Sequence, residues 1–487
     1  MIAPMFSRLR NVLLVGGVLG LLSACAGLSD GGDRLAQCSS LIDRVDQRIA
    51  DKQVGDAEAA PISGFPYLRV NRFLASFRDD MGEMARFDEW IRRLRALDRE
   101  GRSVELQNLG TGDIILMVDE CAEMLLARDF KDAAFQSRLL TAARPPQHYN
   151  DWVRAAGLYP LTHIGVALGF DLWKAENLPT FGEDPSMWSA SETRYTLPTR
   201  SDLSSSDVAA FIDLSAQNAL GIPDVTGSLL MRMAEAYAPV FAVEETSAAD
   251  KLGRPHWSSD GVIPRTDPND PVVYVRLAHT RMDGEVLPQL VYTVWFPERP
   301  MEGVFDILGG ALDGLVWRVT LDRQGRPLVY DSFHSCGCYH LFFPTDLVQR
   351  VSIAEDNDLR EEPLTPMQAP HLQEGERLVL HVASGSHYLR GLSVTPSWED
   401  AKTLRVVDEH ASPEFGLRSA KAEGGTRRSL FAPDGIVAGT ERTERFILWP
   451  MGISSPGAMR QWGTHATAFV GTRHADDPYL FDEAFKR

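Results

Sequence analysis

The chain has 487 residues, of which 44% are hydrophobic and 24% charged, so it is long enough to fold into more than one domain with ordinary hydrophobic cores. Its 67 Asp and Glu outnumber its 49 Lys and Arg, and the formal net charge of −18 should repel nucleic acid and anionic lipid head groups. We therefore expect no nucleic-acid partner, and we expect any attachment to a membrane to come from a lipid.

The first 24 residues have the pattern of an export signal. Arg8 and Arg10 precede an apolar run over residues 12–22. This run is only about half the ~20 residues that a helix needs to cross a bilayer. The pattern predicts a signal peptide over residues 1–24 that is removed, rather than a membrane-spanning anchor.

The end of this segment, Leu22-Ser23-Ala24-Cys25, resembles the bacterial lipobox, in which the signal is cut before a cysteine that then carries a diacylglycerol. The resemblance covers residues 1–25 only, and no family is recognised for the remaining chain. It implies a lipoprotein of the bacterial cell envelope, with acyl chains such as palmitate on Cys25 and a tether over residues 25–34. For this class, a residue other than Asp after the cysteine implies the outer membrane facing the periplasm, and here that residue is Ala26.

Residues 35–176 have a predominantly helical pattern, and we interpret them as a helical domain. Cys38 and Cys121 each lie on an apolar stripe with helical spacing, so two helices packed through these faces bring the sulfurs together. An exported protein meets an oxidising compartment, which permits a Cys38–Cys121 disulfide. The alternative is a pair of buried, unreacted thiols.

Residues 177–270 look like a linker with short helices, and the period of the pattern changes at about residue 271. Residues 290, 292, 294 and 296 are apolar and alternate with a second set, as in a strand with a buried face. Residues 316–321 and 328–330 flank a turn that contains Gly325 and predict a hairpin. Further strands are expected at residues 377–383, 446–449 and 465–474.

The predicted fold class is therefore α+β: a helical N-terminal domain followed by a mainly antiparallel β domain over residues 271–487. The pattern leaves open whether this β domain is a sandwich or a barrel. The common hydrolase and nucleotide-binding motifs, H-E-x-x-H, G-x-S-x-G and G-x-x-x-x-G-K, are missing. Neither a catalytic residue nor an organic cofactor site is predicted, and the sequence does not decide whether the protein is an enzyme.

One cluster of chemically active side chains follows the predicted hairpin, in the sequence His334-Ser335-Cys336-Gly337-Cys338-Tyr339-His340. Thiolate and imidazole are the donors that zinc and copper prefer, so the cluster predicts a metal site with ligands His334, Cys336, Cys338 and His340. In one extended strand the two histidines would lie about 20 Å apart. A bend at Gly337, which tolerates positive φ, is needed to bring the ligands together.

Two other interpretations of this cluster stay open. Cys336 and Cys338 could form a structural disulfide in a non-catalytic lipoprotein whose β domain contacts another envelope protein or polymer. Alternatively, the pair could cycle between dithiol and disulfide as a redox centre, with a neighbouring histidine stabilising the thiolate. More distant histidines could complete the site: His381, His387, His465 and His474. The oligomeric state is not predicted.

Overall fold

A computed structural model of the protein describes residues 31–188, 191–198, 201–258, 261–303, 305–351, 361–412, 415–421 and 425–487. The predicted signal peptide, Cys25 and the first part of the predicted tether lie outside these residues. Within the described ranges, no helix combines the length and the apolar character that a membrane crossing requires.

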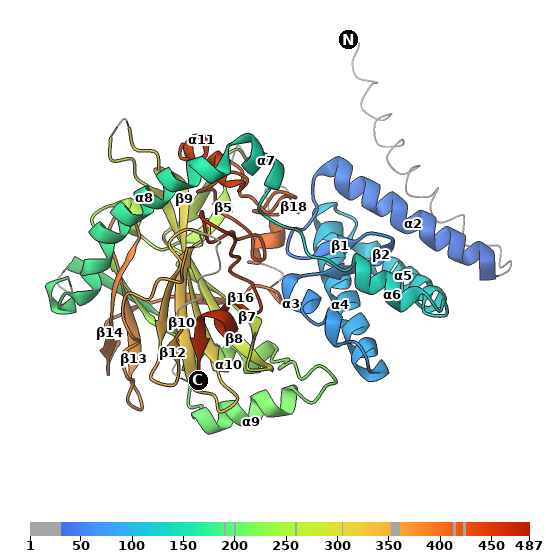
Figure 1. Ribbon diagram of the computed structural model, residues 1–487, viewed down its shortest axis with the longest axis horizontal. Helices are drawn as coiled ribbons and strands as arrows, with labels where there is room; N and C mark the ends of the chain where they lie inside the picture. Colours follow the sequence, from blue (N-terminus) through green and yellow to red (C-terminus); the bar gives the residue numbers. More distant parts are fainter. Residues whose placement is uncertain are drawn as a thin grey trace, which may run out of the picture.

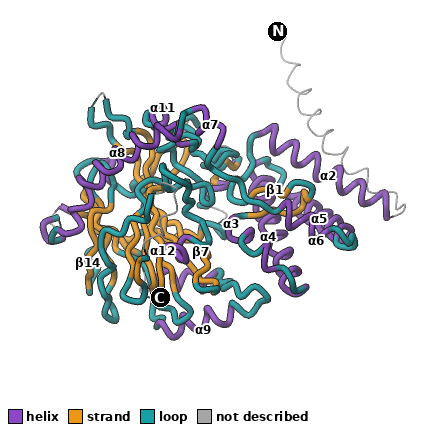
Figure 2. Tube along the Cα trace, in the orientation of Figure 1, coloured by secondary structure: helices purple, strands orange, loops and turns teal. Residues whose placement is uncertain are grey.

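Helices dominate the N-terminal part of the chain, which lies on the right of Figures 1 and 2. Its elements, with η marking a 3-10 helix, are α2 (Gly31–Lys52), β1 (Ala60–Ile62), β2 (Phe65–Val70), α3 (Arg72–Ala75), η2 (Arg78–Asp80), α4 (Met84–Asn108), η3 (Gly112–Ile114), α5 (Ile115–Asp129) and α6 (Phe135–Ala142). These elements share one hydrophobic core, in which Trp90 and Leu94 of α4 are fully buried. Leu220, Ile222 and Val286 join the same core, so this part packs directly against the rest of the molecule.

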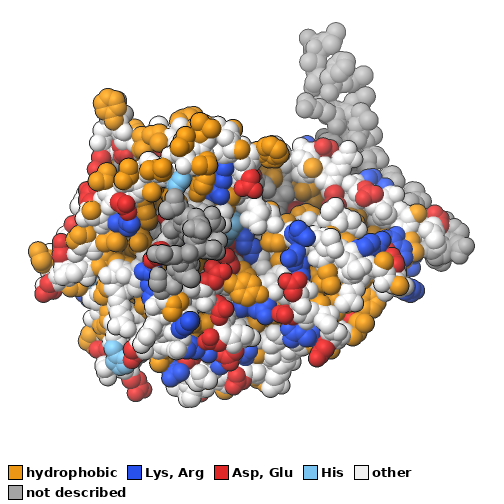
Figure 3. Space-filling view, in the orientation of Figure 1, with side chains coloured by type: hydrophobic (Ala, Val, Ile, Leu, Met, Phe, Trp, Pro, Cys, Tyr) orange, Lys and Arg blue, Asp and Glu red, His pale blue; other side chains and the backbone are white. Residues whose placement is uncertain are grey.

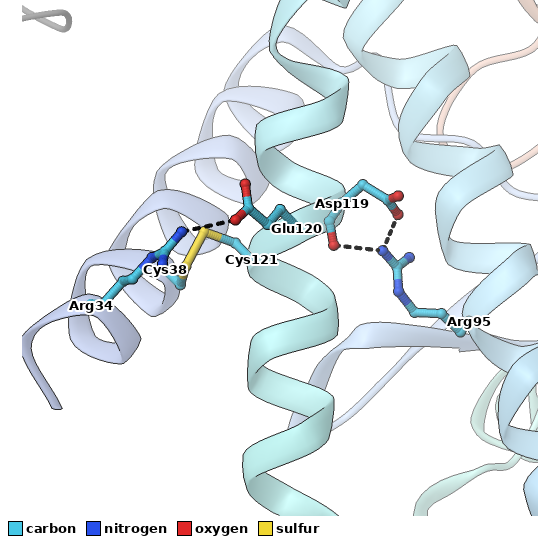
Figure 4. Close-up of a disulfide and its surroundings, with 6 residues drawn as sticks. All are labelled: Arg34, Cys38, Arg95, Asp119, Glu120 and Cys121. Atoms are coloured by element: carbon cyan, nitrogen blue, oxygen red, sulfur yellow. Dashed lines mark hydrogen bonds and ion pairs between the residues drawn. A yellow bond between two sulfur atoms is a disulfide. The ribbon is translucent and has the colours of Figure 1, made fainter. Parts of the chain in front are cut away.

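A disulfide between Cys38 and Cys121 joins α2 to α5, with 4.9 Å between the two Cα atoms (Figure 4). Both cysteines are buried, because the apolar stripes on which they lie face each other. Beside the bridge, Arg34 of α2 forms an ion pair of 2.8 Å with Glu120 of α5. The structure thus contains the pairing that the two stripes predict.

Two large sheets form the C-terminal part. The first has the strand order β11-β10-β9-β8-β7-β16 and the second the order β14-β13-β4-β3-β15. The first consists of β7 (Val272–Met282), β8 (Glu285–Arg299), β9 (Gly310–Leu321), β10 (Pro327–His334), β11 (Leu341–Pro344) and β16 (Arg405–Asp408). The second consists of β3 (Glu192–Thr196), β4 (Val240–Glu244), β13 (Arg377–Val382), β14 (Leu389–Thr395) and β15 (Lys402–Thr403). Most pairs are antiparallel, but β16–β7, β13–β4 and β15–β3 are parallel.

The two sheets share one core, in which Tyr292 and Trp317 of the first sheet belong to the same buried cluster as Phe241 and Leu380 of the second. The described strands therefore pack as two layers and do not close into a barrel. The chain has the predicted α+β fold, with helices mostly N-terminal and strands mostly C-terminal. The predicted hairpin is β9–β10, and Gly325 turns it with φ +70° where a Cβ would lie 2.5 Å from the carbonyl oxygen of Ser205.

Residues 177–270 contain the short helices expected there and also strands. Its elements are η4 (Leu178–Gly182), η5 (Pro185–Met187), β3, α9 (Ser205–Ser215), α10 (Gly227–Ala236), β4, η7 (Ala248–Asp250), β5 (Arg254–Trp257) and β6 (Pro264–Asp267). Through β3 and β4, this segment supplies two strands of the second sheet.

Two helices of the N-terminal half lie over the β-rich part instead of over their sequence neighbours. These are α7 (Asp151–Ala156) and α8 (Tyr159–Asn177), which run along the upper edge in Figure 1. The expected strand at residues 446–449 is wrong, because these residues form α11 (Arg445–Leu448) and the start of η10 (Trp449–Met451) beside those helices. A short apolar run has no period that distinguishes a strand from a helical turn.

The expected strand at residues 465–474 is also wrong, since only an isolated bridge between Ala466 and His474 forms there.

The remaining elements are short: β12 (Gln349–Arg350), η8 (Leu417–Ser419), β17 (Ala420–Lys421), β18 (Arg427–Arg428), α12 (Leu480–Ala484) and β19 (Phe485–Lys486). Long loops therefore make up much of the chain after β16, and they cover one face of the first sheet through a cluster that includes Trp295, Val437 and Met459.

Candidate functional site

The cluster of predicted metal ligands, residues 334–340, lies where a tight turn joins β10 to β11. The backbone N–H of His334 donates to the carbonyl of Cys338 across 3.0 Å, and the N–H of Gly337 donates to the carbonyl of His334 across 2.7 Å. Gly337 has φ +94°, and a Cβ at this position would lie 2.4 Å from the carbonyl oxygen of Ala466. Only glycine fits both the conformation and the space. The predicted bend at Gly337 is therefore present.

Cys336 and Cys338 are both free thiols in this turn. Cys336 is buried and Cys338 is partly buried, and the backbone N–H of Cys338 lies 3.4 Å from the Cys336 sulfur. The pKa of the Cys338 thiol is raised well above its usual range, first by a hydrogen bond with Cys336 and then by burial. At neutral pH, Cys338 is therefore a protonated thiol beside the Cys336 sulfur.

His334 is held beneath this turn by a chain of alternating carboxylates and imidazoles. Its Nδ1 lies 3.4 Å from Oδ1 of Asp313, whose Oδ2 lies 2.9 Å from Nδ1 of His387. Nε2 of His387 in turn lies 3.6 Å from Oδ1 of Asp250. All four residues are at most 3% exposed. Nε2 of His334 is buried and has no hydrogen-bond partner among the described residues.

The carboxylates and imidazoles of this series of four side chains stabilise one another's charges. Burial alone would raise the pKa of Asp313, but the interactions with His334 and His387 outweigh it and hold this pKa well below its usual range. Burial alone would lower the pKa of His387, but the interactions with the carboxylates of Asp250 and Asp313 outweigh it and raise this pKa. Asp313 is therefore an ionised carboxylate, and its Oδ1 orients the ring of His334 through Nδ1.

The two thiols, His334 and Asp313 line a small recess together with Arg299, Tyr339, Arg442 and Glu444. The recess has a volume of about 10 Å³, which is room for about one water molecule. Burial raises the pKa of Glu444 to about 7. Gly457 leaves the space for this carboxyl group, because a Cβ there would lie 2.0 Å from Glu444 Oε1.

Three guanidinium groups lie at or near the recess. Arg299 and Arg442 line the recess, and Arg460 is close enough to interact electrostatically with both cysteines. The backbone of Arg460 is fixed to the turn itself, because its N–H donates to the carbonyl of Ser335 across 2.8 Å. Nη1 of Arg442 is buried without a hydrogen-bond partner in the described chain. Arg460 favours negative charge on Cys338, whereas Glu444 and burial oppose it, and together the guanidinium groups disfavour an additional cation in the recess.

Helix α8 covers one side of the turn with aromatic contacts. The ring of Trp173 on α8 lies 4.9 Å from that of Tyr339, and the rings of Tyr339 and Tyr388 lie 4.4 Å apart. Arg299 donates to the hydroxyl of Tyr388 across 3.0 Å. The recess is therefore lined by residues of β8, β9, the turn and later loops, while Trp173 of α8 and Tyr388 pack against Tyr339 at its side.

The structure brings together three of the four predicted metal ligands. His334, Cys336 and Cys338 line the recess, whereas Nε2 of His340 lies 2.9 Å from Oδ2 of Asp331. This carboxylate also forms a buried ion pair with Arg318 on the other face of β9 and β10. Burial lowers the pKa of His340 to about 4. The positive φ of Tyr339, 59°, interrupts the alternation of side chains and sends His340 to that face.

The only group of three or more metal-donor side chains that the described residues place within 4.8 Å of one another lies elsewhere. It consists of Glu58, Glu100 and His410. Arg276 and Arg418 already form ion pairs with these carboxylates, so the negative charge of this group is balanced within the protein. The four predicted ligands in the turn do not form such a group.

Of the more distant candidates, only His387 joins the recess site. Nδ1 of His381 bonds Glu192 in the second sheet, and the rings of His465 and His474 contact Phe333 and Tyr149. Sequence reasoning missed three contributors in particular: Asp313, Arg442 and Glu444. A signal existed for Asp313, which, like Arg318, is a charged residue inside the mainly apolar strand β9. A buried charge requires a partner, and here the partners are His334 and His387.

Comparisons with known proteins give no relative: no protein-family model, no curated protein and no solved structure matches this chain.

Proposed function

We propose that this protein is a lipid-anchored protein of the bacterial cell envelope whose β-rich part carries a redox centre, the Cys336–Cys338 dithiol. The observation that carries the proposal is the interaction of two free thiols in one tight turn, with the guanidinium group of Arg460 close enough to interact with both. A thiolate is the reactive form of cysteine, and nearby positive charge stabilises it.

The reaction is thiol–disulfide exchange with a substrate disulfide, RS–SR. The sulfur of Cys336, as thiolate, attacks one substrate sulfur, so the substrate S–S bond breaks, a mixed disulfide forms and one thiol leaves after taking a proton. Cys338 then gives its proton to Nε2 of His334 and attacks the Cys336 sulfur, and the second substrate thiolate that is expelled takes this proton from His334 and leaves as a thiol. The substrate gains two electrons and two protons, and the two cysteines are oxidised to a disulfide.

The geometry also supports a second candidate, a metal site formed by His334, Cys336 and Cys338. Metal-binding histidines commonly direct one ring nitrogen at a carboxylate and the other at the metal, and His334 has Asp313 on one side and an unpartnered Nε2 on the other. Zinc or copper would suit these donors. The three guanidinium groups oppose a divalent ion, so we rank this candidate second.

A direct experiment reduces the protein, removes metal and reductant, and adds oxidised glutathione under argon. Mass spectrometry then follows the peptide that contains both cysteines. We expect a Cys336–Cys338 disulfide in the unaltered chain and a trapped mixed disulfide with glutathione at Cys336 in Cys338→Ser. The matched control is the pair Cys38→Ser and Cys121→Ser, which should leave the exchange unchanged. Thiols that stay free of glutathione in all variants would contradict the redox proposal.

Elemental mass spectrometry of the protein purified without chelators separates the two candidates. About one zinc or copper per chain that is lost in Cys336→Ser would favour the metal site. If neither metal nor exchange is found, the remaining candidate is a binding or assembly lipoprotein that contacts another envelope protein or polymer.

The proposed anchor is tested separately from the dithiol. Cells that express the protein are fed a fatty-acid analogue, and the protein is examined for the label. We expect labelling of the unaltered chain and none of Cys25→Ser, because the acyl chains are attached at that sulfur. A labelled Cys25→Ser chain would refute the assignment.

A further inference from the structure

An exposed apolar surface lies at the edge of the molecule formed by α7, α8, α11 and η10. Its large apolar side chains are between 44% and 86% exposed. We call this surface the apolar face and define it by Trp152, Leu158, Leu161, Ile164, Leu168, Leu172, Phe446, Ile447 and Trp449. Exposed apolar side chains are common singly, but a contiguous group of this kind marks a surface that contacts something apolar.

The apolar face is one continuous surface although its residues come from two distant parts of the sequence. α7, α8 and α11 each contact η10. A Cβ on Gly157, between α7 and α8, would lie 3.2 Å from the ring of Trp449. Figure 3 shows hydrophobic side chains gathered along the upper edge, where Figure 1 places α7, α8 and α11.

The outer side of α8 has a regular apolar stripe. Leu161, Ile164, Leu168 and Leu172 follow one another at intervals of three or four residues and are all exposed. The opposite side holds the helix to the protein through buried His163 and through Trp173, which contacts Tyr339. The stripe thus points away from the body of the protein.

Charge is missing from this region. No Asp, Glu, Lys or Arg occurs in residues 155–170, in a chain whose net charge is −18. Two flanking basic side chains are occupied: Arg154 donates to the carbonyls of Met451 and Gly471, and Lys174 forms an ion pair of 2.6 Å with Asp171. Residues 155–170 therefore present no formal charge to an anionic membrane, and the exposed charges nearest the apolar face are those of Asp151 and Asp171 at its margins, with the half-buried Arg445 beside Phe446.

We propose that the apolar face lies in the interfacial layer of a phospholipid bilayer, as a second membrane contact. The choice of a bilayer as the partner rests on the proposed lipid at Cys25. That residue is six positions before Gly31, where the described chain begins, and six residues span at most about 20 Å. The lipid would therefore keep the protein body beside a membrane.

The composition of the face suits such a layer. An apolar helix side enters the boundary between head groups and acyl chains by about 5–10 Å. Trp152 and Trp449 are residues of the kind that collect at this boundary, because their rings are apolar and their N–H groups find polar partners there. Since the face has no cationic residues of its own between positions 155 and 170, binding should depend on apolar burial and should change little with salt.

The test measures binding of the chain that begins at Ala26, which has no acyl group, to vesicles of phosphatidylethanolamine and phosphatidylglycerol by flotation. We expect measurable binding that is the same at low and high salt. The double variant Leu161→Glu with Leu168→Glu should reduce the partition coefficient at least tenfold. The matched control is Leu214→Glu on α9, which is 67% exposed like Leu161 but lies at the opposite edge of the molecule, and it should bind as the unaltered chain does.

Circular dichroism and thermal unfolding check that each variant is folded. If the α8 variant is unfolded, Phe446→Ser and Trp152→Ser on the neighbouring helices replace it and should also reduce binding. No binding by the unaltered chain would overturn the proposal. A chain that forms dimers which Leu161→Glu dissociates, and that does not bind vesicles, would also overturn it and identify a contact between copies. Fatty-acid labelling at Cys25 is scored separately, so failure of the anchor is distinguishable from failure of the face.

Discussion

Asp313 and His387 are joined by a hydrogen bond of 2.9 Å between Oδ2 and Nδ1, beneath the turn that carries the two free thiols. The other oxygen of Asp313 faces His334, which lines the recess with these thiols. A buried carboxylate on β9 thus connects the predicted cysteine turn to His387, which follows His334 by 53 residues in the sequence. The proposed chemistry requires this connection, because it fixes the imidazole that takes the proton from Cys338.

Asp313→Asn tests the role of this carboxylate. Because the variant removes one charge from a buried group of partners, we expect the free energy of unfolding to fall by about 3 kcal/mol. The rate at which Cys338 attacks the mixed disulfide between Cys336 and glutathione should fall as well, and its dependence on pH should change. The control is Asp250→Asn at the far end of the chain of four residues, which should reduce stability but leave the exchange rate unchanged. Equal exchange rates in the unaltered protein and in Asp313→Asn would show that Asp313 is only structural.

His340→Gln tests the placement of His340 on the other face of the sheet. Because Nε2 of His340 bonds Asp331 and not the thiols, we expect the variant to keep the exchange activity of the dithiol and any bound metal. Its free energy of unfolding should fall, by about 1–3 kcal/mol, because a buried hydrogen bond to a charged group is altered. Loss of metal or of exchange in a folded His340→Gln chain would restore His340 to the site.

The Cys38–Cys121 disulfide should stabilise the helical part of the protein. Its cysteines are 83 positions apart, and closing a loop of this length restricts the unfolded chain by about 4 kcal/mol. We expect the unaltered protein to lose thermal stability on reduction and the Cys38→Ser, Cys121→Ser protein to be unaffected by reductant. Differential scanning calorimetry with and without a reductant measures this. An unaltered protein whose unfolding temperature is the same in both conditions would contradict the expectation.

Buried histidines should make the fold sensitive to mild acid. Burial lowers the pKa of His148, His279 and His340 to about 4, that of His465 to about 3 and that of His474 to about 2. The unfolded chain binds these protons near pH 6.5, whereas the folded chain binds them only at lower pH. Their contribution to stability is therefore complete above pH 6.5 and is lost as the pH falls from 6.5 towards 4.

Each such histidine contributes about 1.4 kcal/mol per pH unit in this window. Urea unfolding at several pH values should show the decline in the unaltered protein, and His465→Gln should have a slope that is smaller by about this amount. Comparing slopes removes any constant loss of stability that the substitution causes. The same slope in both proteins would mean that His465 is protonated in the folded state.

Much of the fold could be predicted because its determinants are local in the sequence. The alternation from Leu290 to Phe296 predicts β8, and the position of Gly325 predicts the β9–β10 turn. The stripes around Cys38 and Cys121 predict which faces of α2 and α5 meet. In each case a period or a turn residue is enough, since the physical cause lies within about ten residues.

The site could be predicted only in part, because it depends on residues that meet through the folded chain. Gly337 indicates the bend that brings the two thiols together. The placement of His340, by contrast, depends on the left-handed conformation of Tyr339, a residue that rarely adopts it. Arg442 and Glu444 come from a loop about a hundred residues later and have no local pattern that connects them to the turn.

The expected strand at residues 446–449 shows the same limit from the other direction. Phe446, Ile447 and Trp449 are apolar although they lie on the surface. An apolar run is usually interpreted as buried, and the sequence contains no sign that this one forms an exposed surface with α7 and α8. The exposure of these side chains is what the membrane proposal explains.

The most direct test of the redox centre is a titration of the Cys336–Cys338 pair against mixtures of reduced and oxidised glutathione, with the thiols counted by mass spectrometry. We predict a two-electron transition between about −270 and −120 mV, the range of proteins that exchange disulfides. A pair that stays oxidised below about −300 mV would be a structural disulfide, and a pair that never forms a disulfide would be inert. Either of these results would contradict the proposed function.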